Sequence, residues 1–214
     1  MRPWIKICGL TERRGLEAAV DAGASAVGFV FTGSPRRIDP AAAALLARGL
    51  PPRVQAVAVF HRPDAATVES VLDAFAPDAL QLEPGALGAV PALWRPRVIP
   101  VFHDGDGVRD EIHAFLARHG PRHVHLEGPG RGGRGIPVDR ARARRLAAEV
   151  PLVLAGGLSP ENVAAAIRAV RPLGVDVSSG VESAPGVKDP HRVRAFCEAA
   201  RAAAHDAAAG ENDR

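Results

Sequence analysis

The sequence predicts an α/β protein built as a single (β/α)₈ barrel. Short β-branched apolar runs alternate with amphipathic stretches rich in Ala, Leu and Arg, this alternation repeats eight times, and the chain has 214 residues. Such alternation is typical of βαβ units that share a parallel sheet. Eight units in a domain of this size favour a closed TIM barrel over an open sheet, because closure leaves no edge strand and lets helices cover the whole outside.

The strands are expected where the apolar runs are richest in β-branched residues. In chain order they span Trp4–Cys8, Ala26–Phe31, Gln55–Phe60, Ala79–Leu82, Val98–Phe102, His123–Glu127, Leu152–Ala155 and Gly174–Val177. The helices are expected to begin near Thr11, Asp39, Asp64, Pro84, Gly107, Asp139, Ser159 and Asp189. Several of these starts carry Asp, Ser or Thr where an N-cap would lie, followed by Pro or a carboxylate.

Two segments depart from the regular pattern. Prolines and glycines between Pro84 and Trp94 leave little regular helix in the fourth unit, which we expect to shorten to a turn or loop. The polar, glycine-containing end of the chain is expected to be a disordered tail. The sequence therefore predicts one TIM-barrel domain over residues 1–205 and a tail over residues 206–214.

Composition excludes several classes of protein. The net charge is +3, and acidic residues are interspersed among the arginines, so we expect no nucleic-acid partner. The glycine-arginine segment from Gly130 to Arg134 could suggest RNA binding, but it lacks interleaved aromatic residues. No apolar stretch approaches the roughly 20 residues of a membrane span. The N-terminal ten residues are too mixed for a signal peptide. We expect a soluble, cytoplasmic protein.

Cysteines and histidines give no sign of a disulfide framework or a metal centre. Cys8 and Cys197 lie near opposite ends of the chain, and the eight histidines are scattered. Acid–base chemistry of the kind considered below needs no organic cofactor, so we expect neither a metal nor a cofactor.

The ends of the seventh and eighth strands predict a phosphate site. Gly156 and Gly157 end one strand, and Asp176, Ser178, Ser179 and Gly180 follow at the end of the next. In (β/α)₈ barrels the loops after these strands commonly bind phosphate, because glycines allow the backbone to approach the ligand closely. The alternative is that the glycines simply end a strand tightly.

Two further side chains at strand ends are candidates for catalysis. Cys8 ends the first strand at the mouth of the barrel, although a free cysteine is commonly just a small buried hydrophobe. Glu127 ends the sixth strand and could be either a buried acid or a helix-capping carboxylate. Cys197 lies within a helical pattern, where a packing role is the better interpretation.

Several motifs together resemble the phosphoribosylanthranilate isomerase family. They are KICGLT at Lys6–Thr11, AVGFVF at Ala26–Phe31, SPR at Ser34–Arg36, AGGLSPENV at Ala155–Val163, RPLGVDVSSGVE at Arg171–Glu182 and PGVKD at Pro185–Asp189. They occur in the family's order, span nearly the whole chain and lie in the loops that would form the site. This is stronger evidence than likeness of fold alone.

The resemblance implies an aldose–ketose isomerase of the intramolecular oxidoreductase type, acting in tryptophan biosynthesis. An acid protonates the ring oxygen of N-(5-phosphoribosyl)anthranilate, and a base removes the C2 proton of the resulting iminium. The family's cysteine base corresponds to Cys8 and its acid to Glu127, while Arg36 would bind the anthranilate carboxylate. The small phosphosugar substrate is the implied partner, and a monomer or homodimer is expected.

The sequence departs from the family where the acid and the aromatic group would lie. Glu127 replaces an aspartate, the loop after it is about two residues shorter than expected, and Glu83 replaces a histidine. We consider Arg37 as a cation that could neutralise Glu83. These departures leave two alternatives: a repurposed isomerase of a related phosphosugar, and a non-catalytic phosphosugar-binding paralogue.

Overall fold

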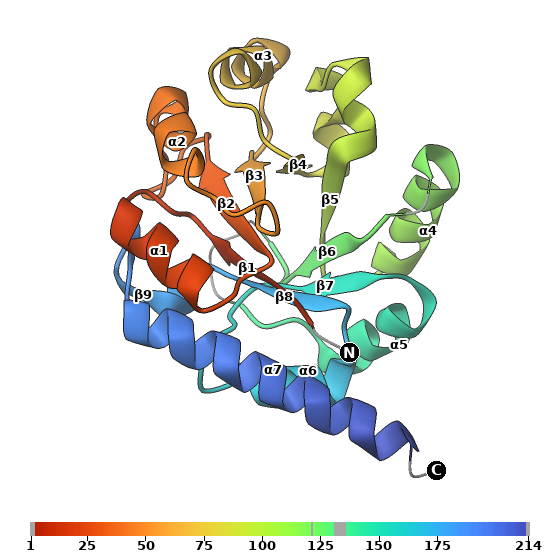
Figure 1. Cartoon of the computed structure of the whole chain (residues 1–214). Coiled ribbons are helices and arrows are strands. Elements are labelled where there is room, and N and C mark those ends of the chain that lie inside the picture. Colours follow the sequence, from red (N-terminus) through yellow and green to blue (C-terminus); the bar gives the residue numbers. More distant parts are fainter. Residues whose placement is uncertain (1–2, 121, 131–135, 213–214) are drawn as a thin grey trace.

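The computed structural model describes residues 3–120, 122–130 and 136–212, and its eight parallel strands close into a barrel (Figure 1). The strands are β1 (Trp4–Cys8), β2 (Ala26–Val30), β3 (Gln55–Val59), β4 (Ala79–Leu82), β5 (Val98–His103), β6 (Val124–Glu127), β7 (Leu152–Leu154) and β8 (Gly174–Val177). The ring closes because β1 pairs in parallel with both β2 and β8. The predicted barrel is confirmed, and each strand lies within one residue of its predicted bounds at either end.

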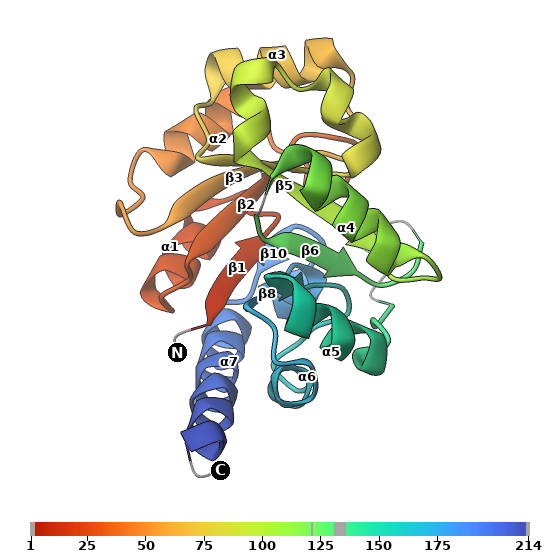
Figure 2. The ribbon, with the colours of Figure 1, turned by 90° about the vertical axis from the view of Figure 1, so that its right-hand side faces the viewer.

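The α-helices surround the strands in both views of the molecule (Figures 1 and 2), and the described residues form seven of them. They are α1 (Arg13–Asp21), α2 (Pro40–Ala47), α3 (Ala65–Ala74), α4 (Val108–His119), α5 (Arg140–Glu149), α6 (Val163–Val170) and α7 (Pro190–Asn212). The carboxylates of Asp39, Asp64, Asp139 and Asp189 accept hydrogen bonds from backbone N–H groups in the first turns of α2, α3, α5 and α7. These are the N-caps that the sequence predicts.

The fourth connection contains no α-helix. It consists of two 3₁₀-helices, η1 (Pro84–Ala89) and η2 (Ala92–Arg97), the second of which has Pro96 inside it. Proline lacks the N–H that a helix interior needs, so the expected shortening is confirmed. Helix α6 begins at Val163, later than predicted, because the Asn162 side chain holds a turn between Gly157 and Ser159.

A short antiparallel ribbon, which the sequence does not predict, follows β8. After the 3₁₀-helix η3 (Ser179–Val181), β9 (Glu182–Ala184) pairs with β10 (Val187–Lys188). Gly186 turns the chain with a φ of 84°, a conformation that glycine adopts without steric cost. The ribbon carries two charged residues, Glu182 and Lys188, to the mouth of the barrel.

Helix α7 continues to Asn212, into the segment where the sequence suggests a disordered tail. The alanines of this segment have high helix propensity and prolong a helix whose earlier residues Ala200 and Ala203 are buried. Asp206 pairs with Arg168 of α6 at 3.3 Å. The division of the chain at residue 205 stays a prediction.

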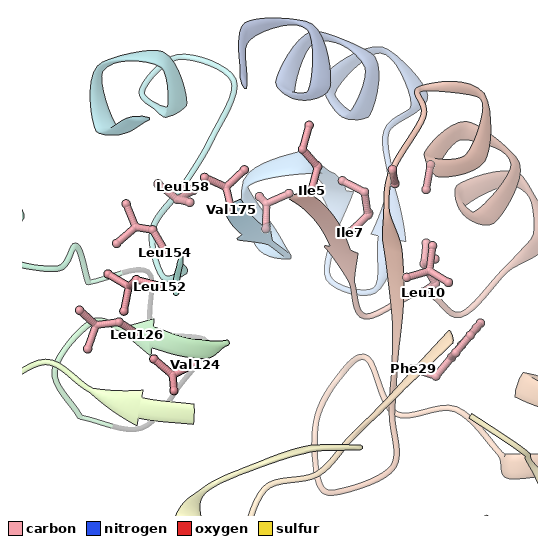
Figure 3. Packing of buried hydrophobic residues seen from close by; sticks show 14 of the residues in the cluster. Ile5, Ile7, Leu10, Phe29, Val124, Leu126, Leu152, Leu154, Leu158 and Val175 are labelled. Carbon is pink, nitrogen blue, oxygen red and sulfur yellow. The ribbon is translucent and has the colours of Figure 1, made fainter. Parts of the chain in front are cut away.

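Two layers of buried side chains fill the molecule. The larger one lies between strands and helices, and Figure 3 shows Ile5 of β1 beside Val175 of β8 within it. The smaller apolar cluster lies inside the barrel and comprises Ala26, Val57, Ala79 and Ile99. Four polar side chains are also buried inside the barrel, namely Lys6, Gln81, His125 and Asp176. None of the helices formed by the described residues has the length and apolar content to cross a membrane.

Candidate active site

A pocket at the carboxyl ends of β1, β6, β7 and β8 contains seven of the nine residues that the sequence predicts for the site. They are Cys8, Glu127, Gly156, Gly157, Asp176, Ser178 and Ser179. Parallel strands bring their carboxyl ends to one rim of a barrel, so residues far apart in sequence meet there. Arg36 and Gly180 lie next to the pocket but do not line it.

Cys8 is the last residue of β1, and its side chain is 8% exposed. The neighbouring strand makes room for it, because a Cβ at Gly28 would lie only 2.9 Å from the Cys8 Sγ. The hydroxyl of Ser178, after β8, donates a hydrogen bond to the Cys8 carbonyl at 3.1 Å. The thiol is therefore held at the mouth of the barrel by both adjacent strands.

Two buried lysines lie around Cys8, and each is paired with a carboxylate. Lys6 Nζ lies 2.7 Å from Asp176 Oδ2, and Lys188 Nζ lies 2.7 Å from Glu182 Oε1. Burial opposes the charge on Lys6, but Asp176 outweighs it and raises the pKa of that ammonium. Burial lowers the pKa of Lys188, and Glu182 opposes this effect.

Burial and local charge act in opposite directions on the Cys8 thiol. Burial raises the pKa of Cys8, while the positive charge of Lys6 lowers it; Asp176 raises it further and Lys188 lowers it. Cys197, in α7, has no comparable pair of lysines, and burial raises the pKa of its thiol to about 11. Two lysines thus lower the pKa of Cys8, whereas Arg201 is the single cation that lowers the pKa of Cys197.

Glu127 ends β6 within the same pocket. Burial, followed by the negative charge of Asp176, raises the pKa of the Glu127 carboxyl. His103 and Lys6 oppose this shift. No described residue donates a hydrogen bond to its side chain. The carboxyl group is therefore held toward its protonated form and is free to donate that proton.

The glycine-rich turns after β7 and β8 are packed tightly against each other. Gly156 and Gly157 both have positive φ, at 82° and 64°, which favours glycine at these positions. Gly156 also passes the backbone of Gly128, where a Cβ would lie 2.8 Å from the Gly128 nitrogen. Gly180 lies so close to the Leu158 carbonyl that a Cβ there would overlap it. These contacts fix the two loops that the sequence assigns to phosphate.

Arg36, in the loop after β2, is bound to Glu182 of β9. Its Nε and Nη2 each donate a hydrogen bond of 2.8 Å to a different carboxylate oxygen. One of these oxygens also accepts from Lys188. A guanidinium used in this way keeps its outer edge, between Nη1 and Nη2, for another carboxylate.

The cation that neutralises Glu83 is Arg62, not Arg37. Arg62 Nε lies 3.1 Å from the Glu83 carboxylate, and His61 and His103 approach it at 3.1 and 3.2 Å. Arg62 makes this contact from a backbone with a φ of 45°, which non-glycine residues seldom adopt. The suggestion that Arg37 neutralises Glu83 is therefore wrong.

Sequence reasoning missed several residues that surround the site. Lys188 and Glu182 belong to motifs that the sequence analysis quotes, but the hairpin that carries them inward was not predicted. His125 escaped notice because a histidine in an apolar strand gives no signal of its own. The glycine-arginine segment lies largely outside the described residues, since 131–135 are not among them.

The comparison with protein families decides the identity of the chain. Residues 5–199 match the model of N-(5′-phosphoribosyl)anthranilate isomerase. The chain belongs to this family. The isomerase of Bordetella petrii is 42% identical over 214 residues, covering 95% of this chain and 97% of that protein.

Solved structures of the family share the fold. Phosphoribosyl anthranilate isomerase from Thermus thermophilus superimposes with a TM-score of 0.79 at 35% identity, covering 92% of this chain and 97% of that one. A family structure in complex with reduced 1-(o-carboxyphenylamino)-1-deoxyribulose 5-phosphate gives a TM-score of 0.75 at 33% identity, with 94% and 99% covered. This chain is thus a phosphoribosylanthranilate isomerase of tryptophan biosynthesis, as the resemblance implies.

Proposed function

We propose that Cys8 is the general base and Glu127 the general acid of the isomerisation. Glu127 gives its proton to the ring oxygen of N-(5-phosphoribosyl)anthranilate, and the C1–O bond breaks to an iminium. The Cys8 thiolate then removes the C2 proton, and the electron pair of the broken C2–H bond forms the C1–C2 double bond of the enamine. Tautomerisation of the enamine yields 1-(2-carboxyphenylamino)-1-deoxyribulose 5-phosphate. The observation that carries this proposal is the shared pocket into which β1 and β6 bring these two side chains.

The environment of Glu127 suits an acid. Burial and the negative charge of Asp176 raise the pKa of its carboxyl, so that it keeps a proton closer to neutral pH than an exposed glutamate does. Because no described residue donates a hydrogen bond to this carboxyl, it delivers its proton to the substrate without first breaking a contact within the described part of the chain.

The fixed charges around Cys8 support a thiolate at the moment of proton removal. Lys6, Lys188 and Arg36 supply three positive charges, while Asp176 and Glu182 supply two negative ones. The difference is one positive charge, which a thiolate balances. Burial favours the neutral thiol, so the thiolate is a minor species in the empty site, and its basicity is correspondingly high.

The phosphate and the aromatic group are assigned to opposite sides of the pocket. The turns containing Gly156, Gly157, Ser179 and Gly180 hold the phosphate through backbone N–H groups and hydroxyls, as glycine-rich loops at such strand ends commonly do. Asp176 and Ser178 lie between these turns and Cys8, within reach of the sugar. The outer edge of Arg36 binds the anthranilate carboxylate while Glu182 holds its inner edge.

The test follows the loss of substrate fluorescence with freshly prepared phosphoribosylanthranilate. Cys8→Ala and Glu127→Gln should each lower kcat by about 10³-fold, in the range that a lost acid or base removes. Cys197→Ala is the matched control, because it removes the other buried thiol, and it should retain activity. Binding of the reduced product analogue, measured by calorimetry, should persist in Cys8→Ala. Full turnover by Cys8→Ala would remove Cys8 from the mechanism.

We also propose that the isomerase works in the cytoplasm, as a monomer or a homodimer. Light scattering at micromolar concentration distinguishes the two assemblies, and fractionation of cells tests the compartment.

A further inference from the structure

A histidine that the proposed mechanism does not use lies directly beneath the pocket. His125 is on β6, two residues before Glu127, and is fully buried inside the barrel. Its Nδ1 lies 3.3 Å from Asp176 Oδ2. Its ring also packs edge-on against Trp4, with ring centroids 5.6 Å apart.

Asp176 connects this histidine to both groups of the proposed acid–base pair. The same Oδ2 atom that faces His125 accepts the hydrogen bond from Lys6 at 2.7 Å. Lys6 lowers the pKa of Cys8, whereas Asp176 raises the pKa values of both Cys8 and Glu127. Any group that weakens the negative field of Asp176 therefore acts on base and acid at once.

His125 is neutral in this position, because burial lowers the pKa of its imidazole. It acts through the dipole of an N–H group and not through a full charge. A neutral ring with its proton on Nδ1 directs that N–H toward Asp176 and leaves Nε2 as an acceptor. The titratable groups that act on the ring are Lys6 of β1, His123 just before β6, and Asp176 of β8. The residues in register with His125 on the two adjacent strands, Val101 of β5 and Val153 of β7, are apolar.

We propose that His125 is a positioning residue, which holds the Asp176 carboxylate from below and offsets part of its negative charge, so that Lys6 can support Cys8. This inference rests on the proposed roles of Cys8 and Glu127. His125 Nδ1 and Lys6 Nζ both approach Asp176 Oδ2, at 3.3 and 2.7 Å respectively. Without His125, Lys6 alone would compensate Asp176, and less of its positive field would reach the thiol.

The expected effect has a definite sign. Loss of the N–H strengthens the negative field of Asp176, which raises the pKa of the Cys8 thiol and that of the Glu127 carboxyl together. Both limbs of the profile of kcat/KM against pH should therefore move to higher pH. A general loosening of the barrel would reduce the height of the profile without moving its two limbs in parallel.

The experiment compares His125→Leu with His125→Asn. Leu and Asn have nearly the same shape, but only Asn keeps an N–H donor close to the position of Nδ1. His125→Leu should shift both limbs upward by about half a unit and slow the reaction of Cys8 with iodoacetamide at pH 8 about threefold. His125→Asn should retain the wild-type profile. His123→Leu is the control, since it removes the neighbouring ring, 5.7 Å away, which has no contact with Asp176.

Coincident pH profiles for wild type and His125→Leu would overturn the inference, as would equal shifts in His125→Leu, His125→Asn and His123→Leu. If His125→Leu does not fold, nitrogen-15 NMR of the wild-type enzyme decides: a proton on Nδ1 is expected, and one on Nε2 contradicts the assignment. The alkylation rates need no substrate. They therefore test the link from His125 to Cys8 even if turnover by Cys8→Ala has already removed Cys8 from the mechanism.

Discussion

Arg36 and Glu182 form a two-point ion pair at the rim of the barrel, with both hydrogen bonds 2.8 Å long. The pair joins the loop after β2 to the ribbon after β8, and Lys188 binds the same carboxylate from the inside. In the proposed binding role of Arg36, a guanidinium fixed in this way presents its remaining edge to the substrate in one orientation. Less conformational freedom is then lost on binding.

Arg36→Lys should weaken substrate binding more than it slows chemistry. A lysine supplies a point charge. It lacks the two edges of a guanidinium, so it cannot make paired hydrogen bonds to Glu182 and to a second carboxylate at the same time. We expect KM to rise about tenfold, corresponding to the loss of one charge-assisted hydrogen bond, with kcat changed much less. Arg37→Lys is the control at an exposed neighbouring position. A fall in kcat at constant KM would contradict a binding role for Arg36.

Glu127→Asp should lower kcat by about 10²-fold, even though aspartate is the family's usual acid. The shorter side chain withdraws the carboxyl by more than an ångström from the position that this pocket provides, and displacements of this size are costly in catalysis. Steady-state kinetics of the variant and the wild type measure the effect. The kcat of Glu127→Gln gives the rate that remains without an acid at this position. Wild-type activity in Glu127→Gln would show that the residue is not the acid, and unchanged activity in Glu127→Asp would show that the position of the carboxyl is not critical.

The reactivity of Cys8 should rise with pH beyond the range of an ordinary thiol. Burial raises the pKa of Cys8, so the thiolate fraction still increases at alkaline pH. Alkylation by iodoacetamide, followed by mass spectrometry of the modified peptide, should show no plateau below about pH 9. Cys197, with a pKa of about 11 and no exposed surface, gives the background rate of alkylation for a buried thiol. A plateau near pH 7 would mean that the two lysines outweigh burial.

Gly180→Ala should destabilise the enzyme and weaken substrate binding together. A methyl group there overlaps the Leu158 carbonyl, so the turns after β7 and β8 must separate. We expect the free energy of unfolding to fall by about 2–4 kcal/mol, as forced overlaps in packed regions commonly cause. Urea denaturation measures this, and Gly105→Ala is the control, because a Cβ at Gly105 meets nothing within 4 Å. Equal stability of the two variants would contradict close packing of the two turns.

The sequence predicts the pocket better than it predicts the contacts within it. Strand ends can be read from the apolar pattern, and a closed parallel barrel places those ends on one rim, so Cys8, Glu127 and Asp176 could be assigned to one region. The partners of long charged side chains depend on loop conformation. Arg62 reaches Glu83 from a left-handed backbone, which no pattern in the sequence indicates.

Two other features escape prediction for different physical reasons. The strands β9 and β10 have three and two residues, too few to show an alternation of apolar and polar side chains. His125 lies on the inner face of a strand, and inside a barrel that face can hold either an apolar or a paired polar side chain. The outcome depends on Asp176, fifty-one positions later in the chain.

The closure of the barrel between its first and last strands determines when the enzyme can become active. Lys6 meets Asp176, and Cys8 meets Ser178, across 170 positions of sequence. Contacts between such distant positions form late, because the chain loses much entropy in making them. A nascent chain that has not yet added β8 has neither the partner of Lys6 nor the turn that supports the thiol. Catalytic turnover during refolding therefore measures the fraction of molecules in which β1 has paired with β8. Molecules with a partly assembled sheet give no turnover.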